Sequence, residues 1–270
     1  MVATDKVFAD SVPEFYDRYL VPLIFERYAS DLAARIAGAT PQDVLETATG
    51  TGVLTTAMVA RLPTSARIVA TDLNQPMLDY AAAKPSLRGR IAWQQADALA
   101  LPFADATFDV VTCQFGAMFF PDKVKGYSEA RRVLKPLGRF LFNVWGRISD
   151  NHFAEVVTDS LAALFPQDPP LFLARTPHGY HDVARIREEL SAAGFRDVSI
   201  ETVDFTSKAA SARDVAIAYC QGTPLRNEIV ARDASRLEEA TNVAEVALAK
   251  RFGDGAIEGL ISAHVIAASA

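Results

Sequence analysis

Short apolar runs alternate with longer amphipathic stretches from Asp43 onward, and this rhythm constrains the fold more than any other feature of the chain. Strand, helix and strand in succession are typical of βαβ units, which form parallel sheets with helices on both faces. The pattern therefore predicts the α/β fold class. The predicted strands, seven in all, cover residues 43–48, 67–71, 91–96, 108–114, 138–145, 196–205 and 260–267. The predicted helices between and after them cover 52–62, 75–84, 122–135 and 180–193.

Helical segments flank and interrupt this alternating pattern. Residues 1–38 show apolar positions every three or four residues, with Pro22 expected to split the segment and Gly38 to end it. Two polar, helix-prone stretches at 149–178 and 208–254 lack flexible Gly, Ser or Pro linkers. We interpret them as insertions in a single domain, 1–270, that should lie over the crevice at the carboxyl ends of the strands.

Charge and cysteine content exclude several classes of function. The chain has 27 Lys and Arg against 33 Asp and Glu, net charge −6, with no long basic tract, which argues against nucleic acid as a partner. Cys113 and Cys220 stand alone, so no metal site is expected. The chain shows neither a secretory signal nor the roughly 20 apolar residues of a membrane span, and a cytoplasmic location is expected.

The strongest local signal is an apolar strand that runs into a glycine-containing turn and a helix, from Val44 to Gly52. Such a turn exposes backbone N–H groups and allows a ligand to approach the main chain. Gly50 and Gly52 form a GxG pair, but the third glycine of a dinucleotide fingerprint is absent. An ordinary tight turn is the alternative.

Three acidic residues near strand ends support a nucleotide site. Asp72 lies twenty residues beyond Gly52 and could accept both hydroxyls of a ribose, although it could instead cap the next helix, a role open to Asn74 as well. Asp97 follows the third strand and could accept from the amine of a purine. Glu46 lies inside an apolar strand, where an unpaired charge is costly, so a cationic ligand is one candidate partner.

Together these motifs resemble the class I S-adenosylmethionine-dependent methyltransferases, and closely the small-molecule branch that includes the ubiquinone and menaquinone biosynthesis methyltransferases. The resemblance implies a Rossmann-like, seven-stranded, mostly parallel sheet, a cofactor-binding core at 43–145, an N-terminal lid over 1–38, and an acceptor cap built from the two insertions. The cofactor-binding residues that it implies are Tyr16, Glu46, Ala48, Thr49, Gly50, Gly52, Asp72, Leu73, Met77, Asp97, Ala98, Gln114 and Phe115. The family usually has glycine where this chain has Ala48. Alanine can adopt most of the glycine conformations with negative φ, but its methyl would narrow the approach to the methionine moiety.

The resemblance implies S-adenosylmethionine as cofactor and in-line methyl transfer to a small-molecule acceptor. Such chemistry needs no dedicated nucleophile, so no catalytic residue is assigned. The candidates for a general base are His152, His178, His181 and His264. The alternatives are a nicotinamide-dependent oxidoreductase and a non-catalytic S-adenosylmethionine-binding module. A homodimer is one assembly that the chain could form.

Overall fold

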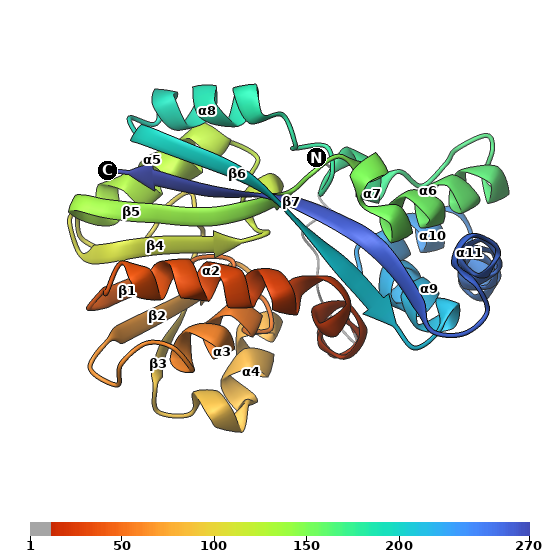
Figure 1. Ribbon diagram of the computed structural model, residues 1–270, viewed down its shortest axis with the longest axis horizontal. Coiled ribbons are helices and arrows are strands. Elements are labelled where there is room, and N and C mark those ends of the chain that lie inside the picture. Colours follow the sequence, from red (N-terminus) through yellow and green to blue (C-terminus); the bar gives the residue numbers. More distant parts are fainter. Residues whose placement is uncertain (1–11) are drawn as a thin grey trace. The chain divides into compact units, whose positions relative to one another are not determined.

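The computed structural model describes residues 12–270 and shows one seven-stranded sheet in the order β3-β2-β1-β4-β5-β7-β6 (Figure 1). Strands β1 to β5 pair in parallel. Gly146 bonds to Ser262 and Gly138 to Ala270, so β7 runs antiparallel to β5. The strands are β1 (Asp43–Glu46), β2 (Arg67–Asp72), β3 (Ile91–Gln95), β4 (Phe108–Gln114), β5 (Leu134–Trp145), β6 (Arg196–Ala209) and β7 (Ile257–Ser269). The predicted sheet is confirmed.

Helices connect the strands as the alternating pattern predicts. They are α1 (Val12–Phe15), the π-helical η2 (Tyr16–Phe25), α2 (Glu26–Gly38), α3 (Val53–Val59), α4 (Gln75–Ala83), α5 (Lys123–Val133), α6 (His152–Leu164), α7 (Phe172–Arg175), α8 (Val183–Ala192), α9 (Ala212–Gln221), α10 (Leu225–Arg232) and α11 (Leu237–Phe252). Short 3₁₀ turns occur at η3 (Pro85–Leu87), η4 (Ala117–Phe119), η5 (Ile148–Asp150) and η6 (Ala234–Arg236). Residues 1–11 of the expected lid lie outside the described part of the chain.

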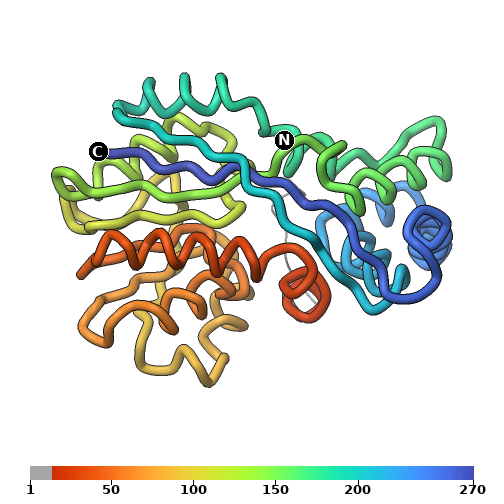
Figure 2. Tube along the Cα trace, viewed as in Figure 1, coloured from red at the N-terminus to blue at the C-terminus, as the bar shows by residue number. Residues whose placement is uncertain are grey.

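The chain forms two compact units. The sheet unit comprises residues 26–144, 181–203 and 264–270, and the helical unit comprises the described residues up to 25 together with 145–180 and 204–263. The boundaries of the single domain, the lid and the cap remain predictions. Figure 2 traces how β5 is followed in the sheet by β7 and then β6, so that segments distant in sequence become neighbours.

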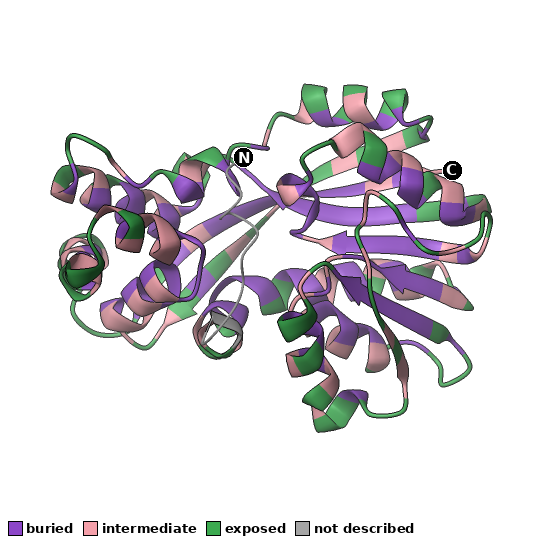
Figure 3. Cartoon of the chain, turned by 180° about the vertical axis from the view of Figure 1, so that it is seen from behind, coloured by how far each residue is buried: buried purple, intermediate pink, exposed green. Residues whose placement is uncertain are grey.

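The two faces of the sheet unit have separate cores. Leu32 and Ile36 of α2 pack with Leu54 and Met58 of α3 against the face that carries Val44. On the opposite face, the ring of Tyr127 from α5 lies 5.7 Å from Phe140 and 5.4 Å from Phe142, and Phe195 stacks on Phe140. Figure 3 shows the central strands filled with buried residues and exposed residues on the outer helix faces, whereas the edge strands β3 and β6 are mostly exposed or half-buried.

The helical unit is held by packing of α11 on α9 and α6. Arg251 of α11 pairs with Glu155 of α6 at 2.7 Å, and Arg213 of α9 pairs with Glu238 of α11 at 2.6 Å. The two stretches expected to be helical insertions are indeed helical. Within residues 12–270, no helix is long and apolar enough to cross a membrane, and no group of three His, Cys, Asp or Glu side chains is arranged to hold a metal ion.

Two local predictions are wrong. Pro22 does not split the first helical segment; it lies inside the π-helical stretch that joins α1 to α2. A wider turn accommodates the missing N–H and the bulk of the proline ring, which a regular α-helix cannot. In addition, β5 begins at Leu134 rather than at 138, with Leu137 at φ +67° and a register shift opposite Phe108 to Val110.

Candidate functional site

The sheet face beneath α2 changes from apolar to polar toward the carboxyl ends of its strands. Alternate residues of a strand face the same side. Val110 and Leu141 lie in the core with Val44, and positions two residues further along these strands are polar although fully buried. These three residues, here called the polar row, are Glu46, Thr112 and Asn143, each at most 1% exposed.

Glu46 is satisfied by neighbouring hydroxyls. Thr55 Oγ1 donates to Glu46 Oε2 at 2.6 Å, and Thr55 and Thr49 are joined through their hydroxyls at 2.8 Å. Burial raises the pKa of Glu46 to about 8, with a further rise from the charge of Asp72, while the two hydroxyls oppose the shift. In the free protein, protonation of Glu46 and the hydrogen bond from Thr55 therefore avoid the cost of an unpaired buried charge. A cationic ligand is not needed as its partner.

The turn after β1 is anchored on both sides and leaves one backbone segment open. The N–H of Thr47 donates to Thr112 O on β4 at 2.9 Å, and the N–H of Thr49 donates to Thr71 O on β2 at 3.0 Å. Gly50, at φ +56°, has no atom within 4 Å of where a Cβ would stand. A ligand could therefore approach the main chain at Gly50.

Ala48 adopts φ +53°, in the left-handed region that favours glycine. The expectation that alanine occupies this position with a negative φ is wrong. The turn imposes the glycine-like conformation because its neighbours Thr47 and Thr49 are tied to β4 and β2. A left-handed alanine costs roughly 1–2 kcal/mol.

Asp72 ends β2 and links the two turns at this edge. Its Oδ2 accepts from the N–H of Gly50 at 2.8 Å, and its Oδ1 accepts from the N–H of Asn74 at 2.8 Å. Burial raises the pKa of Asp72, and these two bonds oppose the rise. Oδ1 also accepts a longer bond from Asn74 Nδ2 at 3.3 Å, so the remaining acceptor capacity for ribose hydroxyls lies on Oδ2. Asn74 occupies the N-cap position of α4, as predicted, although its side chain makes no hydrogen bond to the first turn of the helix.

The neighbouring site residues differ in exposure. Leu73 is 44% exposed, which is unusual for its size, and its carbonyl accepts from Gln95 Nε2 at 2.9 Å. Met77 is buried, and Ala98 is half-buried. Asp97 is exposed, and its Oδ1 accepts from the N–H of Leu99 at 2.9 Å. Leu73 therefore offers an apolar surface beside Asp72, whereas Met77 belongs to the core.

Gln114 and Phe115 end β4 next to the turn after β1. Gln114 pairs in register with Asn143 on β5. Phe115 is 5% exposed, and its ring meets Tyr28 of α2 edge to face at 5.4 Å. A Cβ at the following residue, Gly116, would overlap the methyl of Ala48. The backbone of this turn thus lies at the site, while the Phe115 ring lies in the core.

The structure brings together the predicted residues of the sheet unit at the carboxyl edge of β1 to β4, but their roles remain predictions. Tyr16 belongs to the helical unit, where its ring stacks on Phe25 at 5.1 Å. The candidate bases are divided as well. His178 is buried with Nδ1 3.0 Å from Gly146 O in the helical unit, and His264 Nδ1 lies 3.0 Å from Thr202 Oγ1 in the sheet unit.

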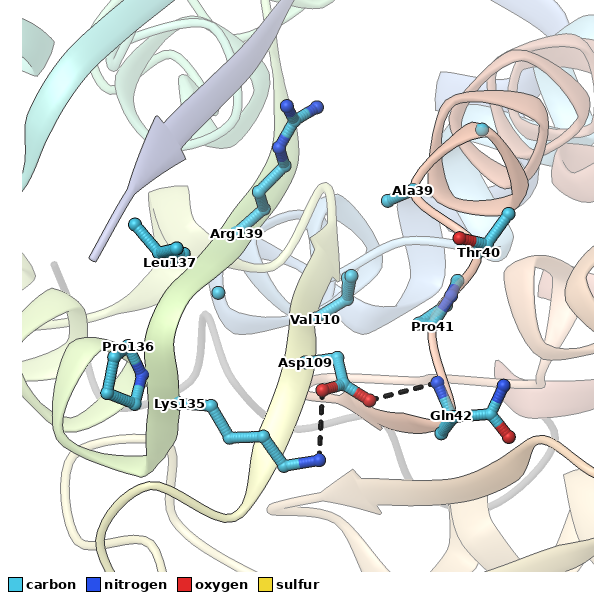
Figure 4. A pocket seen from close by; sticks show the side chains of 12 residues that line it. Ala39, Thr40, Pro41, Gln42, Asp109, Val110, Lys135, Pro136, Leu137 and Arg139 are labelled. Carbon is cyan, nitrogen blue, oxygen red and sulfur yellow. Dashed lines mark hydrogen bonds and ion pairs between the residues drawn. The ribbon is translucent and has the colours of Figure 1, made fainter.

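An open pocket of about 480 Å³ lies at the other end of the strands, near the start of β1, β4 and β5 (Figure 4). There Lys135 Nζ pairs with Asp109 at 2.9 Å, and the N–H of Gln42 donates to the same carboxylate at 2.9 Å. Ligands of open α/β sheets bind at the carboxyl ends of strands. This pocket therefore carries no part of the candidate site.

Sequence reasoning missed Thr55 and Asn143. The signal used for Glu46, a polar residue inside an apolar strand, applies equally to Asn143 in Phe140-Leu141-Phe142-Asn143-Val144-Trp145. Thr55 has no comparable signal, because threonine in the first turns of a helix is ordinary. Only the fold shows that Thr55 reaches the carboxylate of Glu46.

Comparison with known proteins identifies the family. A methyltransferase-domain model matches residues 44–138. A demethylmenaquinone methyltransferase of Deinococcus radiodurans is 30% identical over 207 residues, which cover 72% of this chain and 85% of that protein. This chain belongs to the class I S-adenosylmethionine-dependent methyltransferases. A ubiquinone/menaquinone biosynthesis C-methyltransferase of Idiomarina loihiensis is also 30% identical, over 67% of this chain and 75% of that protein.

Another relative is more similar over a shorter stretch. The demethylmenaquinone methyltransferase of Thermus thermophilus is 43% identical over 120 residues, and that match spans about half of its length, 53%. The solved structure of the YcgJ protein from Bacillus subtilis has a TM-score of 0.57 at 20% identity, over 90% of this chain and 98% of that chain. The [4+2]-cyclase SpnF has a TM-score of 0.56 at 19% identity, over 90% of this chain and 80% of that chain. Both show the fold alone.

Family membership confirms the predicted enzyme class and S-adenosylmethionine as the cofactor. It does not favour the nicotinamide-dependent oxidoreductase. The [4+2]-cyclase has the same fold but is named for a different reaction. The fold by itself therefore does not define the acceptor.

Proposed function

We propose that this enzyme transfers the methyl group of S-adenosylmethionine to a small aromatic acceptor of the quinol type. The observation that carries the proposal is the match to a demethylmenaquinone methyltransferase over 72% of this chain, well beyond the cofactor core. Net charge −6 and the lack of a basic tract argue against nucleic acid as the acceptor.

The carboxyl edge of the sheet unit fits this cofactor in three respects. The open backbone at Gly50 allows a charged, extended moiety to approach. The Asp72 carboxylate has acceptor capacity for ribose hydroxyls. The exposed side chain of Leu73 provides an apolar surface on which a purine ring could pack.

The bound cofactor would supply an activated methyl group on a sulfonium, so the chain's own task is to hold donor and acceptor in line. Asp72 and the turn at Gly50 would hold the donor. A quinol hydroxyl is more acidic than an alcohol. If the bound acceptor is already ionised, no general base is needed; if its hydroxyl is still protonated, a general base would assist the loss of that proton. The residue for that role is left open among the histidines.

The test is turnover. Purified enzyme is mixed with methyl-labelled S-adenosylmethionine and a reduced demethylated naphthoquinone with a short side chain, and the products are separated by mass spectrometry. We expect a product one methyl heavier and an equal amount of S-adenosylhomocysteine. Transfer to another metabolite in an extract, but not to the quinol, would replace the acceptor. Cofactor binding without transfer to anything would favour the non-catalytic binding module.

We also infer a homodimer and a cytoplasmic location. Within residues 12–270, no helix is long and apolar enough to cross a membrane. Sedimentation of the purified protein, and fractionation of cells that express it, test the two inferences separately. A monomer at micromolar concentration would exclude the dimer.

A further inference from the structure

The turn after β4 holds a bulky residue in an unfavourable backbone conformation. Phe115 has φ +51°, although its ring is packed in the core against Tyr28. A left-handed conformation in a large residue persists only where the surroundings impose it, and such positions cluster at functional sites. The contacts that impose it here come from β5 on one side and from the turn after β1 on the other.

On the β5 side, the contact comes from Asn143. The N–H of Phe115 donates both to the carbonyl oxygen of Asn143 and to its side-chain Oδ1, each at 3.1 Å. Asn143 is fully buried, and its Nδ2 has no hydrogen-bond partner among the described residues. A buried amide donor without a partner is costly, so packing alone would favour an apolar residue at this position. Within the side chain of Asn143, the amide oxygen is the atom that accepts a hydrogen bond.

On the β1 side, the contact comes from Ala48. A Cβ at residue 116 would overlap the methyl of Ala48 and would stand 2.7 Å from Cys113 Sγ, so the turn has room here only for a residue without a side chain. A displacement of Phe115 would therefore press Gly116 against Ala48. Ala48 is two residues from Gly50, whose N–H is bound to Asp72.

We propose that Asn143 is a positioning residue that holds the two turns at the carboxyl edge in the geometry the cofactor requires. The Oδ1 atom of Asn143 holds the backbone amide of Phe115 in place. The position of Phe115 determines where Gly116 lies relative to Ala48. Ala48 in turn determines the conformation of the turn that exposes the backbone of Gly50. Only the last step, the effect on cofactor binding, rests on the proposed function. The local effect on Phe115 does not.

The test compares Asn143→Leu, which removes the oxygen, with Asn143→Asp, which keeps an oxygen acceptor. Thr112→Val is the matched control, because Thr112 is another buried member of the polar row and its hydroxyl has no hydrogen-bond partner among residues 12–270. Amide exchange of Phe115 is measured by nuclear magnetic resonance, relative to global stability, and binding of S-adenosylhomocysteine is measured by calorimetry.

We expect Asn143→Leu to speed exchange of the Phe115 amide by roughly 3- to 10-fold, the loss of one weak hydrogen bond, and to weaken binding of S-adenosylhomocysteine by a similar factor. Asn143→Asp should restore both at a pH low enough to keep the buried carboxyl protonated, and Thr112→Val should change neither. If Asn143→Leu does not fold, Asn143→Ala removes the same oxygen without adding bulk. Wild-type exchange in the Leu or Ala variant would overturn the proposal.

The calorimetric result separates this inference from the proposed function. Faster exchange with unchanged affinity would limit Asn143 to a structural role and overturn its positioning of the cofactor. A wild-type protein that binds no S-adenosylhomocysteine would instead count against the proposed function, whatever the exchange of Phe115 shows.

Discussion

The methyl group of Ala48 occupies the space that a Cβ at Gly116 would need. The two residues come from different turns, after β1 and after β4, and each restricts the other. Ala48 is held in a left-handed conformation at φ +53°, and Gly116 must remain a glycine while that methyl is present. The site therefore has one alanine where glycine suits the backbone and one glycine where Ala48 and Cys113 together exclude a side chain.

This pair predicts coupled effects on stability. Gly116→Ala should lower the free energy of unfolding by roughly 1–3 kcal/mol, because the added methyl overlaps Ala48. Ala48→Gly should be neutral or stabilising by up to about 1 kcal/mol, since relief of the left-handed strain exceeds the added chain entropy. The double variant should recover part of the loss. Urea unfolding of the four proteins measures the coupling, and strictly additive effects would contradict the contact.

The buried acid Glu46 predicts a stability that falls as pH rises. Its pKa is near 8 in the folded protein and near 4.5 when exposed, so the folded state binds more protons between these values. The destabilisation is absent below pH 4.5, grows through pH 8, and then levels off. Glu46→Gln should remove this dependence and stabilise the protein above pH 8 by up to about 4 kcal/mol. Unfolding of both proteins at pH 5 and pH 9 tests this; an equal difference at both values would be inconsistent with it.

Asp72 predicts a loss of cofactor affinity. Asp72→Ala should weaken binding of S-adenosylhomocysteine by about 10- to 100-fold, roughly 1–3 kcal/mol, because it removes an acceptor for polar groups of the ligand. Asp79→Ala is the control, since Asp79 is an exposed carboxylate on α4 bonded to Gln75. Titration calorimetry of both variants gives the comparison. An affinity unchanged by Asp72→Ala would remove this residue from the site.

The pair of Glu129 and Arg132 predicts an acid-sensitive segment after β3. Arg132 holds Glu129 at 2.8 Å, and this bond, with the N–H of Leu101, lowers the pKa of Glu129 to about 2 despite burial. Its contribution to stability is full above pH 4.5 and is lost as pH falls toward 2. Glu129→Gln should cost roughly 2 kcal/mol at pH 7 and much less at pH 3. Equal costs at both pH values would argue against the ion pair.

The order and type of the elements could be predicted well from the sequence, because hydrophobic periodicity and the positions of Gly and Pro reflect local physical preferences. Strands of a parallel sheet appear as apolar runs, and α2 ends at Gly38 as predicted, although the left-handed residue at this helix end is Thr40, at φ +48°. The π-helical passage of Pro22 and the irregular start of β5 at Leu137 were missed, since tertiary packing outweighs local preference there.

At the site, sequence reasoning found the residues that end strands and missed those that support them. Asp72 was found because its position follows from the strand and its charge from the chemistry. Asn143 acts through the backbone of Phe115, and Thr55 through Glu46, contacts that depend on strand register and helix placement. The positive φ of Ala48 likewise depends on bonds from both neighbouring strands, which no local pattern shows.

The most direct test of the central claim is calorimetric titration of the purified protein with S-adenosylmethionine, S-adenosylhomocysteine and NAD. The account predicts binding of the first two at one site per chain and no binding of NAD. Tight binding of NAD, with no response to S-adenosylhomocysteine, would contradict it.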